Sequence, residues 1–193
     1  MMSGYQYYEF CKINAPLTAD ARKEMYSLSS RANITTHGAS YVYNYGDFRG
    51  NSKALLLKYF DVFFYISNFG CIQLMFKYSV TEVNAYKLKQ YCIDEPISCE
   101  ITDTHVLLDI DYNNEEGFSD WIEGEEMLIE LLPLYDEIKS GNYEILRILA
   151  DVCDGKTDIL KKPAQGNDID IALSEAQEAF LKFAELDHIL INE

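Results

Sequence analysis

The stretch between residues 52 and 67 constrains the fold most, because large apolar side chains recur there at intervals of three and four. Such spacing places them on one side of an α-helix. Asn51 or Ser52 can cap the start of this helix, and Gly70 stops it. The sequence therefore predicts a central core helix over 52–67. Its apolar positions are Leu55, Leu56, Tyr59, Phe60, Phe63 and Ile66.

Strand patterns lie on both sides of this helix. Residues 5–13, 34–45 and 71–78 are rich in aromatic or β-branched side chains, which favours extended structure. Residues 97–102 and 105–111 predict a hairpin across Asp103 and Thr104. Thr18 can cap a helix over 19–30, because its hydroxyl accepts from the free amides of the first turn. A shorter helical pattern covers 81–90.

Beyond Asn113 the pattern becomes helical. Trp121, Leu128, Leu131 and Leu132 can share one helix face, and Pro133 breaks that helix because it lacks an amide donor. Further helices are predicted over 143–153 and 173–186, with 156–170 as a connecting loop. We therefore predict an α+β fold in which a mixed sheet with two main packed helices precedes a helical, acidic C-terminal half.

The predicted organisation is a single α+β domain over residues 1–154, with a loop and C-terminal helix over 155–193 packing on it. A chain of 193 residues, 48% apolar, is long enough to bury a real core. The most apolar stretch, 60–76, is too interrupted to span a bilayer, so no membrane contact is predicted.

Charge is segregated along the chain. Residues 1–93 carry 10 Lys/Arg against 6 Asp/Glu, whereas residues 94–154 carry 2 against 18. This asymmetry indicates either two surfaces of opposite sign or neutralisation of one half by the other in the folded protein. The formal net charge of −16 would repel a phosphate backbone, so no direct nucleic-acid contact is predicted.

The five cysteines are odd in number and widely spaced, and the chain does not start with a secretory signal pattern. These features predict reduced thiols and a cytoplasmic location. The sequence holds no glycine-rich phosphate loop, nucleophile elbow or zinc-protease helix motif, and we predict no cofactor and no catalytic residue.

Several short motifs lie between residues 7 and 134: Tyr-Tyr-Glu-Phe, Pro-Leu-Thr, Leu-Ser-Ser-Arg-Ala, Tyr-Gly-Asp-Phe-Arg-Gly, and Glu-Gly-Glu followed by Leu-Leu-Pro-Leu. In these motifs the chain resembles a family of bacterial cytosolic proteins of unassigned function. The resemblance covers most of residues 5–155, and the Gly-Asp-Phe-Arg-Gly segment is its most specific part. It implies no activity, and it implies that this chain is the N-terminal portion of a longer protein.

Acidic side chains at alternate positions provide a weak metal candidate. Calcium prefers oxygen ligands at alternate positions of a loop. The pattern lacks the turn glycine and the bidentate glutamate of a calcium loop, so a solvated acidic segment is the preferred interpretation. The residues concerned are Asp109, Asp111, Asn113, Glu115 and Asp120.

A second constellation combines arginines with aromatic residues in a loop-rich segment. Arginine offers a planar donor fork for carboxylates, and tyrosine adds rigid contact area. The competing interpretation is that Asp47 and Arg49 only pair with each other, or with the acidic half, to hold the turn. We predict a partner-binding surface that also uses three glutamates. Its residues are Arg31, Tyr43, Tyr45, Asp47, Phe48, Arg49, Glu123, Glu125 and Glu126.

Together these features predict a non-enzymatic interaction module, an accessory or regulatory subunit of a bacterial complex whose protein partner carries a basic surface. One alternative is an acidic nucleic-acid mimic or inhibitor of a nucleic-acid-binding protein, as in a bacterial defence (CRISPR-associated) context. The other is an enzyme with a carboxylate-bound metal. A mimic would spread its carboxylates over one elongated face, whereas an enzyme would gather a few of them in a cleft.

Overall fold

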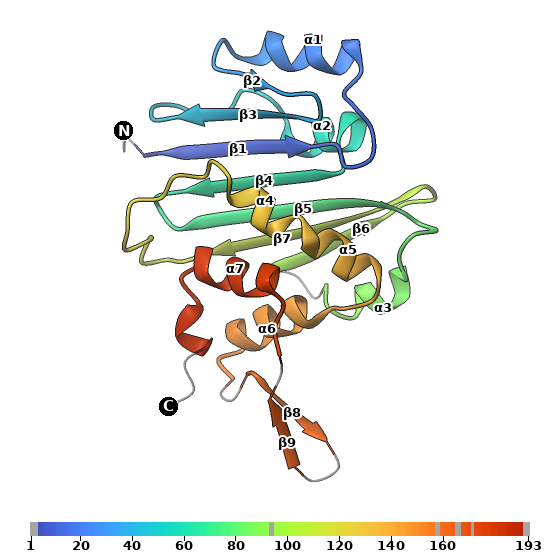
Figure 1. Cartoon of the computed structure of the whole chain (residues 1–193), viewed down its shortest axis with the longest axis vertical. Helices are drawn as coiled ribbons and strands as arrows, with labels where there is room; N and C mark the ends of the chain where they lie inside the picture. Colours follow the sequence, from blue (N-terminus) through green and yellow to red (C-terminus); the bar gives the residue numbers. More distant parts are fainter. Residues whose placement is uncertain (1–3, 93–94, 157–158, 165–166, 171, 191–193) are drawn as a thin grey trace.

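The structure is a computed structural model that describes residues 4–92, 95–156, 159–164, 167–170 and 172–190. It is built on a seven-stranded sheet with the order β2-β3-β1-β4-β5-β7-β6 (Figure 1). Every neighbouring pair in this sheet is antiparallel, so the predicted mixed sheet is wrong. The strands are β1 (Gln6–Cys11), β2 (Asn33–Ile34), β3 (Gly38–Tyr43), β4 (Val62–Ser67), β5 (Cys71–Ser79), β6 (Ile97–Ile101) and β7 (His105–Asn113).

The helices divide between the two ends of the chain. The N-terminal part holds α1 (Ala19–Leu28), α2 (Ser52–Tyr59) and α3 (Ala85–Lys89). The C-terminal part holds α4 (Met127–Leu131), α5 (Pro133–Lys139), α6 (Glu144–Cys153) and α7 (Glu175–Phe183), with a 3₁₀ helix over Asp187–Leu190. Because β7 runs to Asn113 and helix resumes only at Met127, the helical part is the C-terminal third rather than the predicted half.

Two segments differ from the sequence-based prediction in kind. The predicted loop 156–170 contains the antiparallel pair β8 (Lys161–Ala164) and β9 (Asn167–Asp170). The predicted helix 52–67 ends at Tyr59, and its second half is strand β4 in the middle of the sheet. A central strand buries both of its faces, so its apolar residues do not alternate with polar ones and resemble a helix pattern.

Other elements form as predicted. Thr18 caps α1 by accepting from the Ala21 amide at 3.2 Å, and Asn51 caps α2 by accepting from the Ala54 amide at 2.9 Å. The hairpin β6–β7 forms across the predicted turn. No helix within the described residues is long and apolar enough to cross a membrane.

The sheet separates two hydrophobic clusters. On one face, α4, α5, α6 and α7 pack against β1, β4, β5 and β7 through mainly aliphatic side chains, and we call this the helical layer. In Figure 1, α4, α5 and α7 pass in front of the sheet. On the other face, α1 and α2 cover a smaller cluster that centres on Phe10, Tyr41, Phe60 and Phe63, and we call this the aromatic layer.

Candidate functional site

Five of the predicted partner-binding residues line one pocket of about 340 Å³: Arg31, Tyr43, Tyr45, Asp47 and Arg49. The pocket lies where β3 ends, beside the turn that follows α1. The Arg31 guanidinium lies over the Tyr43 ring, 5.5 Å from the ring centroid. The structure thus brings together two segments that are twelve or more residues apart in the sequence.

The loop after β3 is held in place by contacts with β1. Gln6 donates through its side-chain amide to the Gly46 carbonyl (3.0 Å) and to the Asp47 carboxylate (3.1 Å). Gly46 has a φ of +78°, a conformation that favours glycine. The Phe48 ring lies half-buried in the aromatic layer, with its centroid 4.7 Å from that of Tyr41. Phe48 therefore anchors the loop, while its neighbours remain exposed.

The two arginines of this pocket form no ion pair within the part of the chain that the structure describes. Among the described residues, neither Arg31 nor Arg49 has a carboxylate oxygen within 4.0 Å. The interpretation in which Asp47 and Arg49 pair to hold the turn is therefore wrong, since Gln6 fills that role. An unpaired guanidinium on a fixed loop is suited to bidentate recognition of a carboxylate.

A second concave region adjoins this pocket. A hollow of about 270 Å³ is lined by Tyr5, Asn44, Trp121, Glu123 and Glu125. A third hollow, of about 380 Å³, includes both Tyr45 and Trp121 and so joins the other two. The Tyr45 side chain is 72% exposed and that of Trp121 is 68% exposed. We call this continuous region the end surface; it comprises Arg31, Tyr43, Tyr45, Asp47, Arg49, Trp121, Glu123 and Glu125.

Tight packing fixes the glutamates of the end surface. Gly124 is buried, and its amide donates to the Tyr5 hydroxyl at 2.9 Å. A Cβ atom at this position would lie 2.5 Å from the Tyr7 ring, so only glycine fits without a shift. Because Gly124 points inward, Glu123 and Glu125 on either side of it are exposed. Burial also raises the pKa of Tyr5, so its hydroxyl stays protonated while it accepts from the Gly124 amide.

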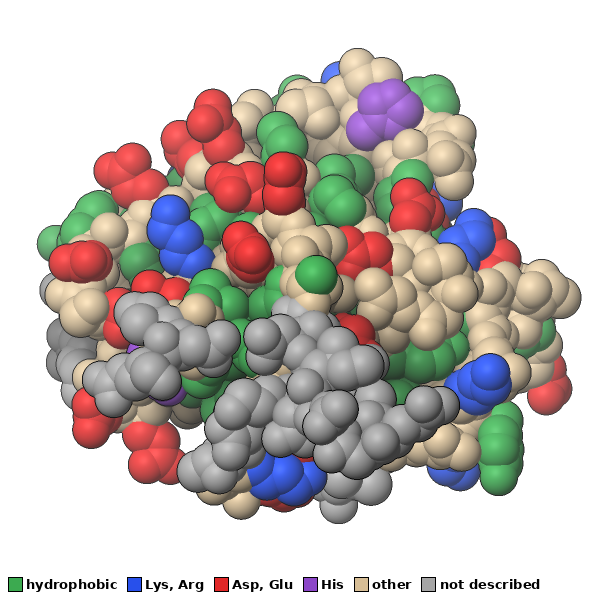
Figure 2. All heavy atoms as spheres, turned by 60° about the horizontal axis from the view of Figure 1, so that its bottom comes forward, with side chains coloured by type: hydrophobic (Ala, Val, Ile, Leu, Met, Phe, Trp, Pro, Cys, Tyr) green, Lys and Arg blue, Asp and Glu red, His purple; other side chains and the backbone are tan. Residues whose placement is uncertain are grey.

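Glu126, the remaining predicted glutamate, lies apart from the three hollows at the start of α4, where its φ is +72°. It belongs to a segment from 115 to 130 in which seven carboxylates are exposed and, within the described residues, form no ion pair. This acidic charge is therefore presented to solvent and is not neutralised by the basic half. Figure 2 shows Asp and Glu side chains spread over one face, with hydrophobic side chains exposed between them.

The candidate metal ligands do not form a loop. Asp109, Asp111 and Asn113 lie on strand β7, where alternate residues are about 7 Å apart along the chain. Asp109 accepts two contacts from the Gln73 amide, at 2.9 and 3.1 Å. Glu115 and Asp120 follow in the exposed acidic segment. Within the described part of the chain, no group of three His, Cys, Asp or Glu residues could hold a metal ion.

Sequence reasoning missed Trp121 as a member of the site. It predicted this side chain on a buried helix face, whereas residues 121–124 have no helical structure and the Trp121 ring is exposed beside the Tyr5 ring, with centroids 5.9 Å apart. The available signal was the position of the chain's single tryptophan within an acidic segment.

Comparison with known proteins identifies no relative of this chain. No protein-family model, no curated protein and no solved structure matches this chain. The resemblance to a bacterial family of unassigned function therefore stays a prediction, and the function rests on the geometry of the site.

Proposed function

We propose that this protein is a non-enzymatic interaction module, an accessory or regulatory subunit that binds a protein partner through the end surface. One observation carries the proposal: three separate segments converge there and leave Tyr45 and Trp121 largely exposed beside two unpaired arginines. Large exposed aromatics and arginines are the residues that most often dominate the free energy of protein binding.

The charges of the end surface specify a partner with both signs of charge. Arg31 and Arg49 would engage carboxylates, whereas Glu123 and Glu125 would engage lysine or arginine. Because the whole chain carries a formal net charge of −16, long-range electrostatic attraction favours a partner whose surface is basic. The aromatic rings between the two charged groups would supply contact area that excludes water from them.

The cysteines support a non-enzymatic role. A nucleophilic thiol needs a lowered pKa, since the thiolate is the reactive form. Burial instead raises the pKa of Cys11 to about 11 and raises that of Cys71, Cys92 and Cys153 above the ordinary value. These thiols would stay protonated and unreactive near neutral pH.

A second candidate function is an acidic mimic that occupies the nucleic-acid groove of another protein. The observation that favours it is the run of exposed, unpaired carboxylates between residues 115 and 130. A mimic would bind through these carboxylates even when the aromatic residues of the end surface are removed.

The test compares variants in capture of a partner from cells, followed by binding kinetics with that partner. Tyr45→Ala with Trp121→Ala should speed dissociation by tenfold or more (on the order of a hot-spot loss), and Arg49→Ala should have the same direction of effect. Glu123→Gln with Glu125→Gln should mainly slow association and reduce its salt dependence.

Matched controls make the same kinds of substitution at exposed positions outside the end surface. Tyr86→Ala removes a tyrosine that is 78% exposed on α3, and Glu115→Gln with Glu116→Gln removes two exposed carboxylates outside the end surface. Both should bind like the natural protein. If the aromatic pair has no effect and Glu115 and Glu116 matter as much as Glu123 and Glu125, the acidic mimic replaces our proposal.

A further inference from the structure

Another hollow lies at the other end of β1, a strand whose six residues rise by roughly 17 Å. This groove has a volume of about 620 Å³, within the range of protein binding sites. It runs between the chain that follows β1 and the helices α4 and α5. Apolar side chains line it, namely Ile13, Ile129, Leu132 and Pro133, and we call it the helix groove.

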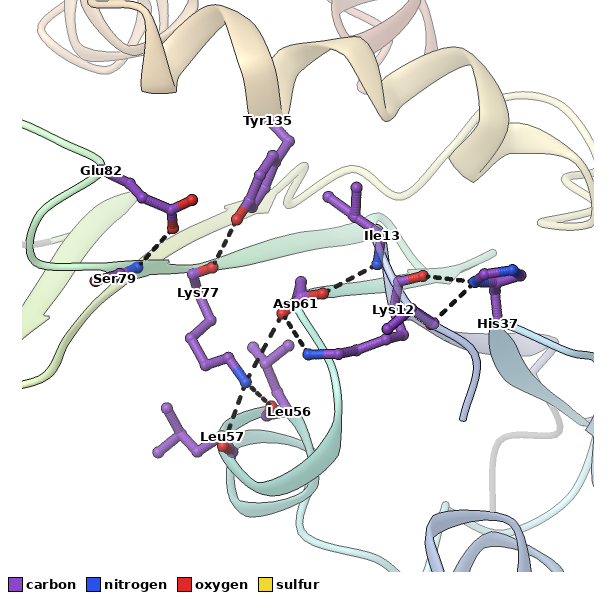
Figure 3. Close-up of polar contacts among 11 residues, drawn as sticks. Lys12, Ile13, His37, Leu56, Leu57, Asp61, Lys77, Ser79, Glu82 and Tyr135 are labelled. Carbon is purple, nitrogen blue, oxygen red and sulfur yellow. Dashed lines mark hydrogen bonds and ion pairs between the residues drawn. The ribbon is translucent and has the colours of Figure 1, made fainter. Parts of the chain in front are cut away.

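One wall of the helix groove is fixed by the carboxylate of Asp61. Figure 3 shows Lys12 and Lys77 reaching this carboxylate from different elements. Asp61 accepts from the Ile13 amide at 3.0 Å and from the Lys12 ammonium at 3.1 Å. His37 adds contacts from its Nδ1 atom to the backbone carbonyls of Lys12 (3.3 Å) and Ala15 (3.0 Å). The turn after β1 is therefore held in one conformation.

The opposite wall is also fixed. The Tyr135 hydroxyl donates to the Lys77 carbonyl and the Tyr78 hydroxyl donates to the Tyr135 carbonyl, each at 3.1 Å, which attaches α5 to β5. On this wall Ile129 is 70% exposed although it lies beside the partly buried Leu132. A preformed groove with an exposed apolar residue costs little ordering entropy when a ligand binds.

The charges around the helix groove favour a basic occupant. Asp136 lines the groove, and Glu126 and Glu130 are exposed on the adjoining α4 segment; none of the three has an ion pair among the described residues. No lysine or arginine occurs between residues 114 and 138. Across the groove, the ammonium of Lys12 is already paired with Asp61. The unsatisfied charge at the rim is therefore negative.

We propose that the helix groove binds an amphipathic peptide segment of a partner protein, which places apolar side chains against Ile129 and Leu132 and lysine or arginine against Glu130 and Asp136. Grooves of this kind accept a helix whose apolar residues recur at intervals of three and four. This site is separate from the end surface and does not depend on it.

The probe is a short fluorescein-labelled amphipathic peptide of leucine and lysine, measured by fluorescence anisotropy. Its counterpart has glutamate in place of each lysine and should not bind. Ile129→Ser should weaken binding of the lysine peptide by about tenfold or more, since one apolar anchor is lost. Glu130→Gln with Asp136→Asn should weaken binding several-fold and reduce its dependence on salt.

Three controls separate this site from bulk charge and from the end surface. Tyr86→Ser, the pair Glu115→Gln with Glu116→Gln, and the pair Tyr45→Ala with Trp121→Ala should all bind the lysine peptide like the natural protein. These residues are exposed in the structure, so their variants should fold. Loss of binding in the second control would show non-specific attraction, and loss in the third would place the peptide on the end surface.

Other results would also overturn the proposal. Unchanged binding by Ile129→Ser would remove the apolar anchor on which it rests. Self-association in sedimentation experiments, abolished by Ile129→Ser, would show that the occupant is a second copy of this chain. Hydrogen exchange of the complex should show added protection over residues 11–13 and 127–137, and protection elsewhere alone would contradict the assignment.

Discussion

The two faces of the sheet are covered in different ways. The helical layer is rich in leucine and isoleucine that come from both the strands and the four helices, whereas the aromatic layer centres on phenylalanine and tyrosine side chains, several of them on the strands, with α1 and α2 above them. Phe63 and Phe64 are adjacent on β4 and lie on opposite faces, 1% and 0% exposed. One strand therefore supplies buried side chains to two chemically distinct cores.

The two candidate surfaces lie where each layer ends. At the margin of the aromatic layer, the end surface lies over Tyr43 and Phe48, whose rings belong to or pack against that layer. At the margin of the helical layer, the helix groove includes Cys11, Ile13 and Leu132, which pack against that layer. Rigid core side chains thus support exposed apolar ones at both sites, which keeps the contact residues in place before a partner binds.

The largest expected effect tests whether the two layers unfold together. Phe63→Ala and Phe64→Ala should each lower the free energy of unfolding by about 3–5 kcal/mol, because each removes a fully buried ring and leaves a cavity. Urea denaturation followed by circular dichroism measures both losses. If the layers form one cooperative unit, both variants keep a single transition with similar losses; a second transition in one variant only would show that its layer unfolds separately.

An intermediate effect is expected at Asp61, which joins the layers. It contacts Lys12, Lys77 and the Ile13 amide, and its side chain is 16% exposed. Asp61→Asn should lower the free energy of unfolding by about 1–3 kcal/mol, because the partly buried ammonium groups of Lys12 and Lys77 lose the negative charge that faces them. Glu100→Gln breaks the exposed pair with Lys53 and serves as control, with a smaller expected loss because exposed ion pairs add little to stability. Equal losses in thermal or urea unfolding would contradict this difference.

The sequence predicted single elements well where one face is buried. The α1 cap at Thr18, the β6–β7 hairpin and the start of α2 at Asn51 all depend on local chemistry and are confirmed. It failed at residues 60–67, because burial of both faces of β4 removes the alternation that marks a strand. Asp61 was the overlooked signal, since it lies in the break between the end of α2 at Tyr59 and the start of β4 at Val62.

The candidate site could be predicted only in part, because local patterns specify its loop but not the long-range contacts around it. The loop with Tyr45, Asp47 and Arg49 was identified from its residue types alone. Its closeness to Trp121 and Glu123 depends on how the segment after β7 crosses back over β1, which no local pattern specifies. The helix groove was missed altogether, because it forms between elements that are more than a hundred residues apart in the sequence.

The smallest expected effect is a difference in how the free energy of unfolding depends on pH, between a carboxylate on one side of the sheet and a carboxylate on the other. Glu9 lies on the helical side of β1, where burial raises its pKa above the ordinary value although Tyr7 donates to it at 3.0 Å. The folded state then binds the proton more tightly than the unfolded state, so the free energy of unfolding falls as pH rises from the ordinary to the raised pKa. Glu9→Gln should remove this fall and be slightly more stable than the natural protein at pH 7, with no difference below about pH 4.

Glu24 on α1, beside the aromatic layer, should have the opposite effect on how the free energy of unfolding changes with pH. Hydrogen bonds from Lys58 and Tyr59 lower the pKa of its exposed carboxylate. The unfolded state then binds the proton more tightly, so this contribution to stability is present above the ordinary pKa and is lost as pH falls through the lowered one. Glu24→Gln should therefore be slightly less stable than the natural protein at pH 7 and equal to it in acid.

Urea unfolding of both variants between pH 3 and about pH 8 measures the two slopes of the free energy of unfolding against pH. Parallel slopes would show that the carboxylates on the two sides of the sheet experience the same environment, since only opposite shifts can make the two substitutions act in opposite directions at neutral pH.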